Sequence, residues 1–348
     1  MKFLVYGAGA IGGYLGGMLA LGGHTVAFIA RPAQADALNT RGLTVHNTHS
    51  VIRNTRNIRA FPSSSEALAQ SPYDCLLLAL KSFDTDTAIA DLQAAGAAAP
   101  PIVCLQNGVD NEPKLREAFG PENVIAGTVL TAVAAPEPGV IVIEKSRGAG
   151  LGGGHPLSDR LASALSSADV YTKVYPDAEA MKWTKLLTNL MGNAASAICD
   201  VTTEVVFTHS GLYEIEVRAL KEALAVMQTK GLAVAALPRS PTRQLAFALQ
   251  YLPPRWYQPV FRRTLGGARG DKKPSLHIDL LARKTRSEVA FLNGAVARHA
   301  EALGLNAPVN RALTEILEGI VAGRMAWEEY QGKPDKLAKE ILGADRHR

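Results

Sequence analysis

A glycine-rich segment near the N-terminus has the spacing of a phosphate-binding turn. It follows the apolar residues 2–6 and reads Gly7-Ala8-Gly9-Ala10-Ile11-Gly12. In this pattern the first glycine permits a tight turn, the second lets the backbone approach a pyrophosphate, and the third allows helix and strand to pack closely. Amides at the start of the next helix then face the phosphates. Glycine-rich turns also occur as simple connections, so the neighbouring elements must decide between the two interpretations.

The neighbouring residues favour a nucleotide-binding unit. Residues 2–6 predict a strand, residues 13–21 a helix that ends at Gly22 and Gly23, and residues 25–30 a second strand. This β-α-β unit has the size of a right-handed parallel crossover. We therefore predict that residues 7–12 bind a dinucleotide.

Arg31 follows the second predicted strand, where an NAD enzyme would carry Asp or Glu for the ribose hydroxyls. The first acidic residue after this strand is Asp36. A guanidinium can pair with the additional 2′-phosphate of NADPH, whereas a carboxylate would repel it. The sequence therefore predicts NADPH/NADP⁺ as cofactor; the alternative is that Arg31 is a solvated residue at a strand end.

Three polar residues recur every four positions in an apolar segment further along the chain. These are Lys185, Asn189 and Asn193, and their neighbours Leu186, Leu187, Leu190 and Met191 indicate a mostly buried helix. A polar stripe on such a helix is costly unless it faces a polar cleft or finds partners. We expect the stripe to form a site; the alternative is a polar seam between helices.

At these residues the chain resembles the ketopantoate reductase family, which joins a G-x-G-x-x-G domain to a helical domain that opens on W-x-K-x-x-x-N-x-x-x-N. The matching residues are Trp183, Lys185, Asn189 and Asn193, with further likeness at Lys81, Gln106-Asn107-Gly108, Pro274-Ser275, Ser287-Glu288-Val289 and Leu292-Asn293-Gly294. The resemblance covers most of residues 1–325. It implies reduction of a 2-oxo acid, 2-dehydropantoate, to its 2-hydroxy acid by NADPH, a step of pantothenate biosynthesis.

The resemblance also implies a role for each matching residue. Lys185 is expected to be the general acid that meets the developing alkoxide. Glu288 would hold the hydroxyl side of the substrate or orient Lys185. The substrate's polar groups would bind Asn189, Asn193 and Ser275, and the nicotinamide end of the cofactor would lie beside Lys81 and Asn107.

Several of these residues have a simpler structural interpretation. Lys81 could merely end a strand, and Asn107 could be a turn residue before Gly108. Ser275 has the character of a helix N-cap. Glu288 could pair with Lys284 on a solvated helical face.

The chain departs from the family pattern near Ser275. One more residue separates Ser275 from Glu288 than in the family, and Lys272 stands where the family commonly has asparagine. The proline-containing segment 237–273 is also longer than expected and predicts an insertion or lid. The acid that is reduced therefore stays open.

The elements that must position these residues fall into two domains. Apolar strands at 75–80, 102–105 and 124–127 alternate with helices at 85–94 and 112–119, which predicts a parallel sheet covered on both faces. After residue 177 the pattern becomes helical, with helices expected at 178–197, 212–230, 242–252, 275–303 and 308–326. We predict an α/β fold: a Rossmann domain at 1–176 with a mainly parallel sheet, then an all-α domain at 177–348 for substrate binding and dimerisation.

Length and composition agree with an enzyme of this kind. The 348 residues suit two domains, and 47% hydrophobic with 20% charged residues is ordinary for a globular protein. A net charge of +5 suits an anionic cofactor and substrate, and the basic residues lack the aromatic interleaving typical of nucleic-acid binding. Three distant cysteines predict neither a disulfide framework nor a metal site. We expect no secretory signal or membrane span, a cytoplasmic location, and a homodimer.

Two other functions fit part of the sequence. A β-hydroxyacid dehydrogenase-type enzyme would also place a lysine and an asparagine on a helix after a Rossmann domain. A catalytically inactive NADP(H)-binding sensor would keep the glycine turn but would not need Lys185 and both asparagines.

Overall fold

The computed structural model describes residues 1–47, 52–55, 57–70, 72–96, 98–253, 256–257, 259 and 273–344. Contacts divide the chain into two units, Met1–Lys182 with Leu237–Ser240, and Trp183–Ala236 with Pro241–Arg348. The change of unit falls inside helix α7 (Ala178–Leu190), a few residues after the expected domain boundary between 176 and 177.

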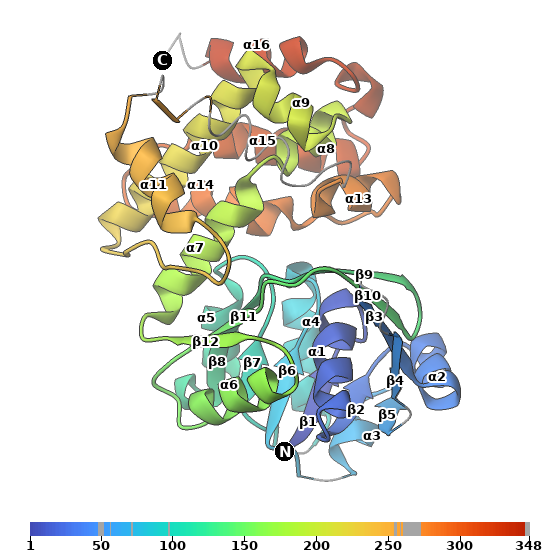
Figure 1. Cartoon of the computed structure of the whole chain (residues 1–348). Helices are drawn as coiled ribbons and strands as arrows, with labels where there is room; N and C mark the ends of the chain where they lie inside the picture. The colour runs from blue at the N-terminus through green and yellow to red at the C-terminus, as the bar shows by residue number, and fades with distance from the viewer. Residues whose placement is uncertain are drawn as a thin grey trace. The chain divides into compact units, whose positions relative to one another are not determined.

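The first unit is built on an eight-stranded sheet (Figure 1). Its strand order is β12 (Thr172–Tyr175), β11 (Ala149–Gly152), β8 (Val124–Val129), β7 (Ile102–Cys104), β6 (Cys75–Leu78), β1 (Lys2–Tyr6), β2 (Thr25–Ile29) and β5 (Ile58–Phe61). Neighbouring strands are parallel except β8 and β11, so the predicted mainly parallel sheet is confirmed. From β1 the chain continues to β2 on one side of β1, and later adds β6 on the other side of β1. This change of direction is where such folds bind ligands.

Apolar cores cover both faces of this sheet. Along β1, Phe3 and Val5 lie in one core with α1 (Ala10–Leu21), whereas Leu4 lies in another with residues of α4 (Thr85–Ala94) and α5 (Asn111–Phe119). Strands buried on both faces explain the nearly continuous apolar runs in the sequence. The remaining helices of this unit are α2 (Pro32–Arg41), α3 (Ser64–Leu68), α6 (Ser158–Ser167), η1 (Ser82–Asp84) and η2 (Pro121–Asn123).

Helix α1 is packed between two sheets. The second sheet has the order β4 (Ile52–Thr55), β3 (Leu43–Asn47), β10 (Val140–Lys145) and β9 (Ala132–Glu137). A Cβ atom at Gly16 would lie 2.4 Å from Phe28 of the main sheet, and one at Gly17 would lie 2.4 Å from Leu43 of the second sheet. These two consecutive glycines therefore allow both sheets to approach α1 closely.

All described elements of the second unit are helical, which confirms the predicted all-α domain. After α7 they are α8 (Ala194–Cys199), α9 (Thr203–Thr208), α10 (Ser210–Thr229), α11 (Thr242–Tyr251), α13 (Ser275–Leu281), η3 (Glu288–Phe291), α14 (Asn293–Ala302), α15 (Pro308–Val321), η4 (Trp327–Glu329) and α16 (Pro334–Ala344). Trp183 is fully buried in this unit and meets the His299 ring edge to face, with ring centroids 5.1 Å apart. Among the described residues, no helix is both long and apolar enough to span a bilayer.

Two helices predicted as continuous are interrupted. The segment 178–197 breaks after Leu190 because Gly192 takes a φ of +62° and its amide donates to Glu216 Oε2 at 2.7 Å. The segment 275–303 breaks after Leu281, where Arg283 has a φ of +50°. Neither break contains a proline, and the helical spacing of apolar residues continues through both. The sequence therefore did not predict the interruptions.

Candidate functional site

The glycine turn leaves space at one of its three glycines. Gly7 has a φ of +103°, and a Cβ there would lie 2.9 Å from the Ala79 carbonyl oxygen. A Cβ at Gly12 would lie 1.8 Å from the Gly7 carbonyl oxygen. At Gly9, by contrast, no atom of the described residues other than its chain neighbours lies within 4 Å of the Cβ position. The chain itself therefore requires Gly7 and Gly12, whereas the room beside Gly9 suits a ligand.

The start of α1 places several amide donors at this turn. The helix begins at Ala10, three residues earlier than predicted, and its first described bond runs from the Gly13 amide to the Gly9 carbonyl at 2.7 Å. The amides of Ala10, Ile11 and Gly12 therefore precede the repeating helical bonds. The first turn contains no acidic residue. Amide donors and the helix dipole favour an anion here, as a dinucleotide phosphate requires.

Arg31 lies at the sheet edge next to this turn. The Gly7 amide donates to the Ile29 carbonyl at 3.0 Å, which ties the turn to the end of β2. Arg31 is the N-cap residue of α2, and its carbonyl accepts hydrogen bonds from the Gln34 and Ala35 amides. Its side chain is exposed. Its backbone is therefore held beside the turn while its guanidinium is accessible to a ligand.

Lys81 follows β6 and Asn107 follows β7, and hydrogen bonds connect the two segments. Gln106 Nε2 donates to the Lys81 carbonyl at 3.0 Å. The Asn107 carbonyl accepts from Ser82 Oγ at 2.8 Å and from Asn111 Nδ2 at 2.7 Å. The two predicted residues thus belong to one polar network at the carboxyl ends of β6 and β7.

In the second unit, Asn193 joins two segments that are far apart in sequence. Its Nδ2 donates to the Asn189 carbonyl at 3.0 Å and lies 3.4 Å from Ser275 Oγ. Its Oδ1 accepts from the Leu276 amide at 3.1 Å. Lys185 and Asn189 lie one turn apart on α7, but Asn193 lies beyond the end of that helix. The predicted single-helix stripe is therefore wrong, although Asn189, Asn193 and Ser275 do meet.

Lys185 and Glu288 differ in their surroundings. Lys185 is half-buried on α7, and Thr188 Oγ1 donates to its carbonyl at 2.7 Å. Glu288 is only 2% exposed, and Lys284 Nζ lies 2.5 Å from Asp279 Oδ1 instead. The alternative of a solvated Glu288–Lys284 pair is therefore wrong.

Two further expectations fall near Ser275. Pro274 occupies the N-cap position of α13, so Ser275 is the first helical residue and the N-cap interpretation is wrong. Lys272 lies outside the described residues. Within the segment 237–273, residues 237–240 belong to the first unit and α11 to the second.

A buried lysine, Lys182, was missed at the sequence level. It is 4% exposed, and its Nζ lies 2.7 Å from Glu112 Oε1. Burial opposes its charged form, but the attraction of Glu112 outweighs this and raises the pKa of Lys182. The sequence offered only a weak signal for a buried lysine. Lys182 stands between the apolar residues Met181 and Trp183, which are both buried, but its partner Glu112 lies on another helix.

A second missed cluster surrounds His277, two residues after Ser275. The ring is fully buried, with Nδ1 3.0 Å from Ser196 Oγ and Nε2 2.6 Å from Asp200 Oδ1. Lys273 Nζ also lies 3.0 Å from Asp200 Oδ1. These contacts hold the start of α13 against the end of α8, on both sides of Ser275.

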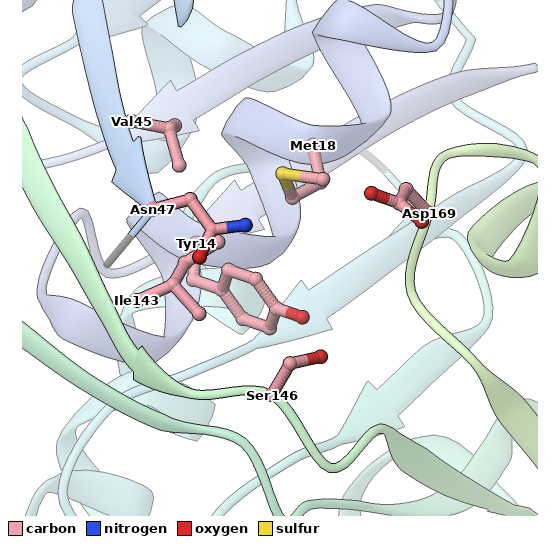
Figure 2. A pocket seen from close by; sticks show the side chains of 7 residues that line it. All are labelled: Tyr14, Met18, Val45, Asn47, Ile143, Ser146 and Asp169. Carbon is pink, nitrogen blue, oxygen red and sulfur yellow. The ribbon is translucent and has the colours of Figure 1, made fainter. Parts of the chain in front are cut away.

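A small cavity in the first unit lies between α1 and the second sheet (Figure 2). Its volume is about 60 Å³, and its lining is Tyr14, Met18, Val45, Asn47, Ile143, Ser146 and Asp169. Since a water molecule occupies about 30 Å³ of liquid, this space is far too small for a dinucleotide. It contains no predicted site residue and is distinct from the glycine turn.

Comparison with known proteins assigns the chain to a family. The family model described as Ketopantoate reductase PanE/ApbA matches residues 3–152, and that described as Ketopantoate reductase PanE/ApbA C terminal matches residues 177–321. A 2-dehydropantoate 2-reductase of Pyrococcus horikoshii is 26% identical over 91% of this chain and 97% of its own length.

Solved structures show the same two-part fold. A PanE/ApbA family ketopantoate reductase from Ralstonia eutropha JMP134 has a TM-score of 0.78 at 26% identity, over 93% of this chain and 99% of that one. A D-mandelate dehydrogenase solved with NADH and anilino(oxo)acetate has a TM-score of 0.75 at 18% identity, over 93% and 99%, which shows the fold alone. With both family models covering most of its length, the chain belongs to the ketopantoate reductase family.

Proposed function

We propose that this protein reduces 2-dehydropantoate to the corresponding 2-hydroxy acid with NADPH. The observation that carries the proposal is the meeting of Asn193 with Ser275, 82 positions further along the chain, and with the carbonyl of Asn189. These residues match the family's pattern, and amide and hydroxyl groups suit a substrate that carries carboxylate and hydroxyl oxygens.

The proposed chemistry divides among the residues of the two units. When bound, the reduced nicotinamide supplies the hydride. Lys185 stabilises the negative charge that develops on the carbonyl oxygen and donates the proton that completes the hydroxyl group. Polar groups of the substrate bind Asn189, Asn193 and Ser275, and Glu288 holds the hydroxyl side of the substrate or orients Lys185.

The cofactor is held by the first unit. The open space at Gly9 and the amides that begin α1 fit a pyrophosphate, while Lys81 and Asn107 serve the nicotinamide end. Arg31 favours NADPH because its guanidinium can pair with the 2′-phosphate. The fold does not decide this choice, since the D-mandelate dehydrogenase of similar fold was solved with NADH.

Steady-state kinetics test the proposal directly. The purified protein would be assayed with 2-dehydropantoate and other 2-oxo acids using NADPH and NADH, and with 3-hydroxy acids using NADP⁺ and NAD⁺. We expect the highest kcat/KM with 2-dehydropantoate and NADPH. Oxidation of a 3-hydroxy acid alone would indicate a β-hydroxyacid dehydrogenase-type enzyme, and tight NADPH binding without any turnover would indicate a sensor. Either result rejects the proposed function.

We also propose a cytoplasmic homodimer formed through the helical unit. All three cysteines are buried and free, which suits a reducing compartment. On α11, Phe247 and Tyr251 are 56% and 69% exposed with ring centroids 5.2 Å apart, and exposed apolar patches often mark interfaces. Sedimentation velocity that gives a monomer mass at micromolar concentration would reject the dimer.

A further inference from the structure

The buried pair of Lys182 and Glu112 lies entirely within the first unit. Both side chains are 5% exposed and lie at the carboxyl end of the main sheet, beside β7 and β8. Removing two charges from water is costly, and a buried ion pair is often no more stabilising than well-packed apolar residues. The pair therefore calls for an explanation beyond the stability of the fold.

The Lys182 ammonium group directs its contacts at two backbone carbonyls as well as at Glu112. Nζ donates to the Gln106 carbonyl at 2.6 Å and to the Gly127 carbonyl at 3.2 Å, and Glu112 Oε1 lies at 2.7 Å. The two carbonyl oxygens accept hydrogen bonds from the ammonium group, and the Glu112 carboxylate lies beside it as the counter-charge. Glu112 keeps the ammonium charged, and the charge strengthens its hold on both carbonyls.

The hold on Gln106 fixes the peptide that leads into Asn107. In a planar trans peptide the C=O and the following N–H point in opposite directions. With the Gln106 oxygen drawn to Lys182, the Asn107 amide is directed away from Lys182. The orientation of the Asn107 backbone is thereby set from its N-terminal side.

Other contacts fix the same loop from its opposite side. The Asn107 carbonyl accepts from Ser82 Oγ and Asn111 Nδ2, and Gln106 Nε2 donates to Thr85 Oγ1 at 2.9 Å. Asn111 and Glu112 are consecutive at the start of α5. One helix start therefore supplies both the acceptor that holds Lys182 and the donor that holds Asn107.

We propose that Lys182, charged by its pairing with Glu112, is a positioning residue that orients Asn107 for the nicotinamide end of the cofactor by holding the Gln106–Asn107 peptide. This inference rests on the proposed function, in which Asn107 serves that end of the cofactor. Lys182 acts through the loop and takes no part in proton transfer.

Paired variants separate positioning from stability. Lys182→Met leaves Glu112 as a buried unpaired carboxylate, so we expect a lower Tm together with lower kcat. The double variant Lys182→Met/Glu112→Leu replaces the pair with apolar side chains of similar size and should regain most of the Tm. Since small displacements of a positioning group can lower turnover up to about a hundredfold, we expect the double variant to keep a kcat roughly ten- to hundredfold below wild type.

Nucleotide binding gives a second readout that does not depend on turnover. The adenosine half, represented by 2′,5′-ADP, should bind the double variant and the wild type equally, whereas the additional affinity of complete NADPH should decrease in the variant. Lys114→Met is the matched control. Lys114 lies on α5, the helix that carries Glu112, and forms a largely exposed ion pair with Asp86 at 2.8 Å. It should change neither Tm nor kcat.

The outcomes distinguish this inference from the proposed function. Recovery of both Tm and kcat in the double variant, with unchanged NADPH affinity, would show that the pair is only structural and overturn the inference. A wild-type protein that turns over no 2-oxo acid would instead overturn the proposed function, and the inference with it.

Discussion

Gly9 and Gly12 lie three positions apart in one turn, yet the structure gives each a different reason to be glycine. At Gly12 the obstacle to a side chain is the Gly7 carbonyl of the chain itself, whereas at Gly9 the part of the chain that the structure describes presents no obstacle. Gly12 is therefore required by the packing of the turn, whereas Gly9 leaves space for a ligand.

Alanine substitutions should separate these two reasons. Gly12→Ala should lower the free energy of unfolding by about 1–3 kcal/mol or more, because the new methyl group overlaps a backbone oxygen. Gly9→Ala should leave the Tm nearly unchanged and weaken NADPH binding. Thermal melts and fluorescence titrations check both variants, and equal NADPH affinity in Gly9→Ala and wild type would contradict the assignment of this space to the cofactor.

In the proposed function, Arg31 determines the preference for NADPH over NADH. Arg31→Ala should lower the ratio of kcat/KM with NADPH to that with NADH by roughly ten- to hundredfold, since a charge-assisted contact contributes about 1.5–3 kcal/mol. The ratio is measured with one acid substrate under identical salt. An unchanged ratio would return Arg31 to the role of a solvated strand-end residue.

In the proposed function, Lys185 donates the proton that completes the hydroxyl group. Lys185→Ala should lower kcat by about 10²–10⁴-fold with little change in the Kd of NADPH, because its contact develops mainly in the transition state. Lys339→Ala, an exposed lysine of α16, is the control. Parallel loss of turnover and nucleotide affinity would point to a structural role for Lys185.

Among single residues, local patterns were predictable and distant partners were not. The glycine spacing, Arg31 after the second strand and the Lys185–Asn189 pair all lie within short segments whose periodicity the sequence displays. Lys182 and His277 depend on Glu112 and Asp200, which the sequence separates by 70 and 77 positions. Their significance is set by tertiary packing, so no local pattern reveals it.

Among the elements, the break between α7 and α8 determines where Asn193 lies. Glu216 of α10 is 2% exposed and accepts the Gly192 amide, so a third helix stabilises the interruption. The break turns Asn193 from α7 toward the start of α13, where it contacts Ser275 and Leu276.

Removing the acceptor at this break should affect both stability and substrate use. Glu216→Ala leaves the Gly192 amide without that partner and should lower the free energy of unfolding by about 1–3 kcal/mol. It should also raise KM for the 2-oxo acid, because Asn193 is no longer fixed. Glu216→Gln keeps an acceptor oxygen and should lose less of both; urea titrations and substrate kinetics compare the two. Identical behaviour of the two variants would argue against the hydrogen bond as the cause.

The order and type of elements followed from sequence, but some helix ends did not. Strands β1, β2, β6, β7 and β8 and helices α4 and α5 lie close to their predicted positions because each has a clear apolar period and glycine or polar boundaries. The ends of α7 and α13 depend instead on positive φ angles at Gly192 and Arg283. A contact from α10 stabilises the angle at Gly192, whereas the bonds at Arg283 are local, with the Lys284 amide donating to the Asp279 carbonyl at 3.1 Å. Apolar periodicity records neither angle.

For the molecule as a whole, His277 links stability to pH. Burial lowers the pKa of His277 below its ordinary value of 6.5; Asp200 opposes this, and the nearby Lys273 reinforces it. Below pH 6.5 the unfolded chain binds a proton that the folded chain resists, so the free energy of unfolding should fall as the pH decreases from 7.5 to 5. This contribution is fully present above pH 6.5.

Comparison of wild type with His277→Gln tests this dependence. The variant has no titrating ring, so its stability should change less over the same pH interval, whatever its stability at pH 7.5. Urea titrations at several pH values provide the measurement. Parallel pH curves for the two proteins would assign the dependence to other groups.

The short return of Leu237–Ser240 to the first unit has a consequence for how this family can be recombined. Leu237 is buried there, and Arg239 Nη1 donates to the Ser146 carbonyl at 3.1 Å. The chain therefore changes unit at three points, and the nucleotide-binding unit is not one continuous stretch of sequence. A chimera that takes this unit from a relative must exchange two gene segments. A single crossover near residue 182 would leave residues 237–240 of this chain packed against the relative's unit.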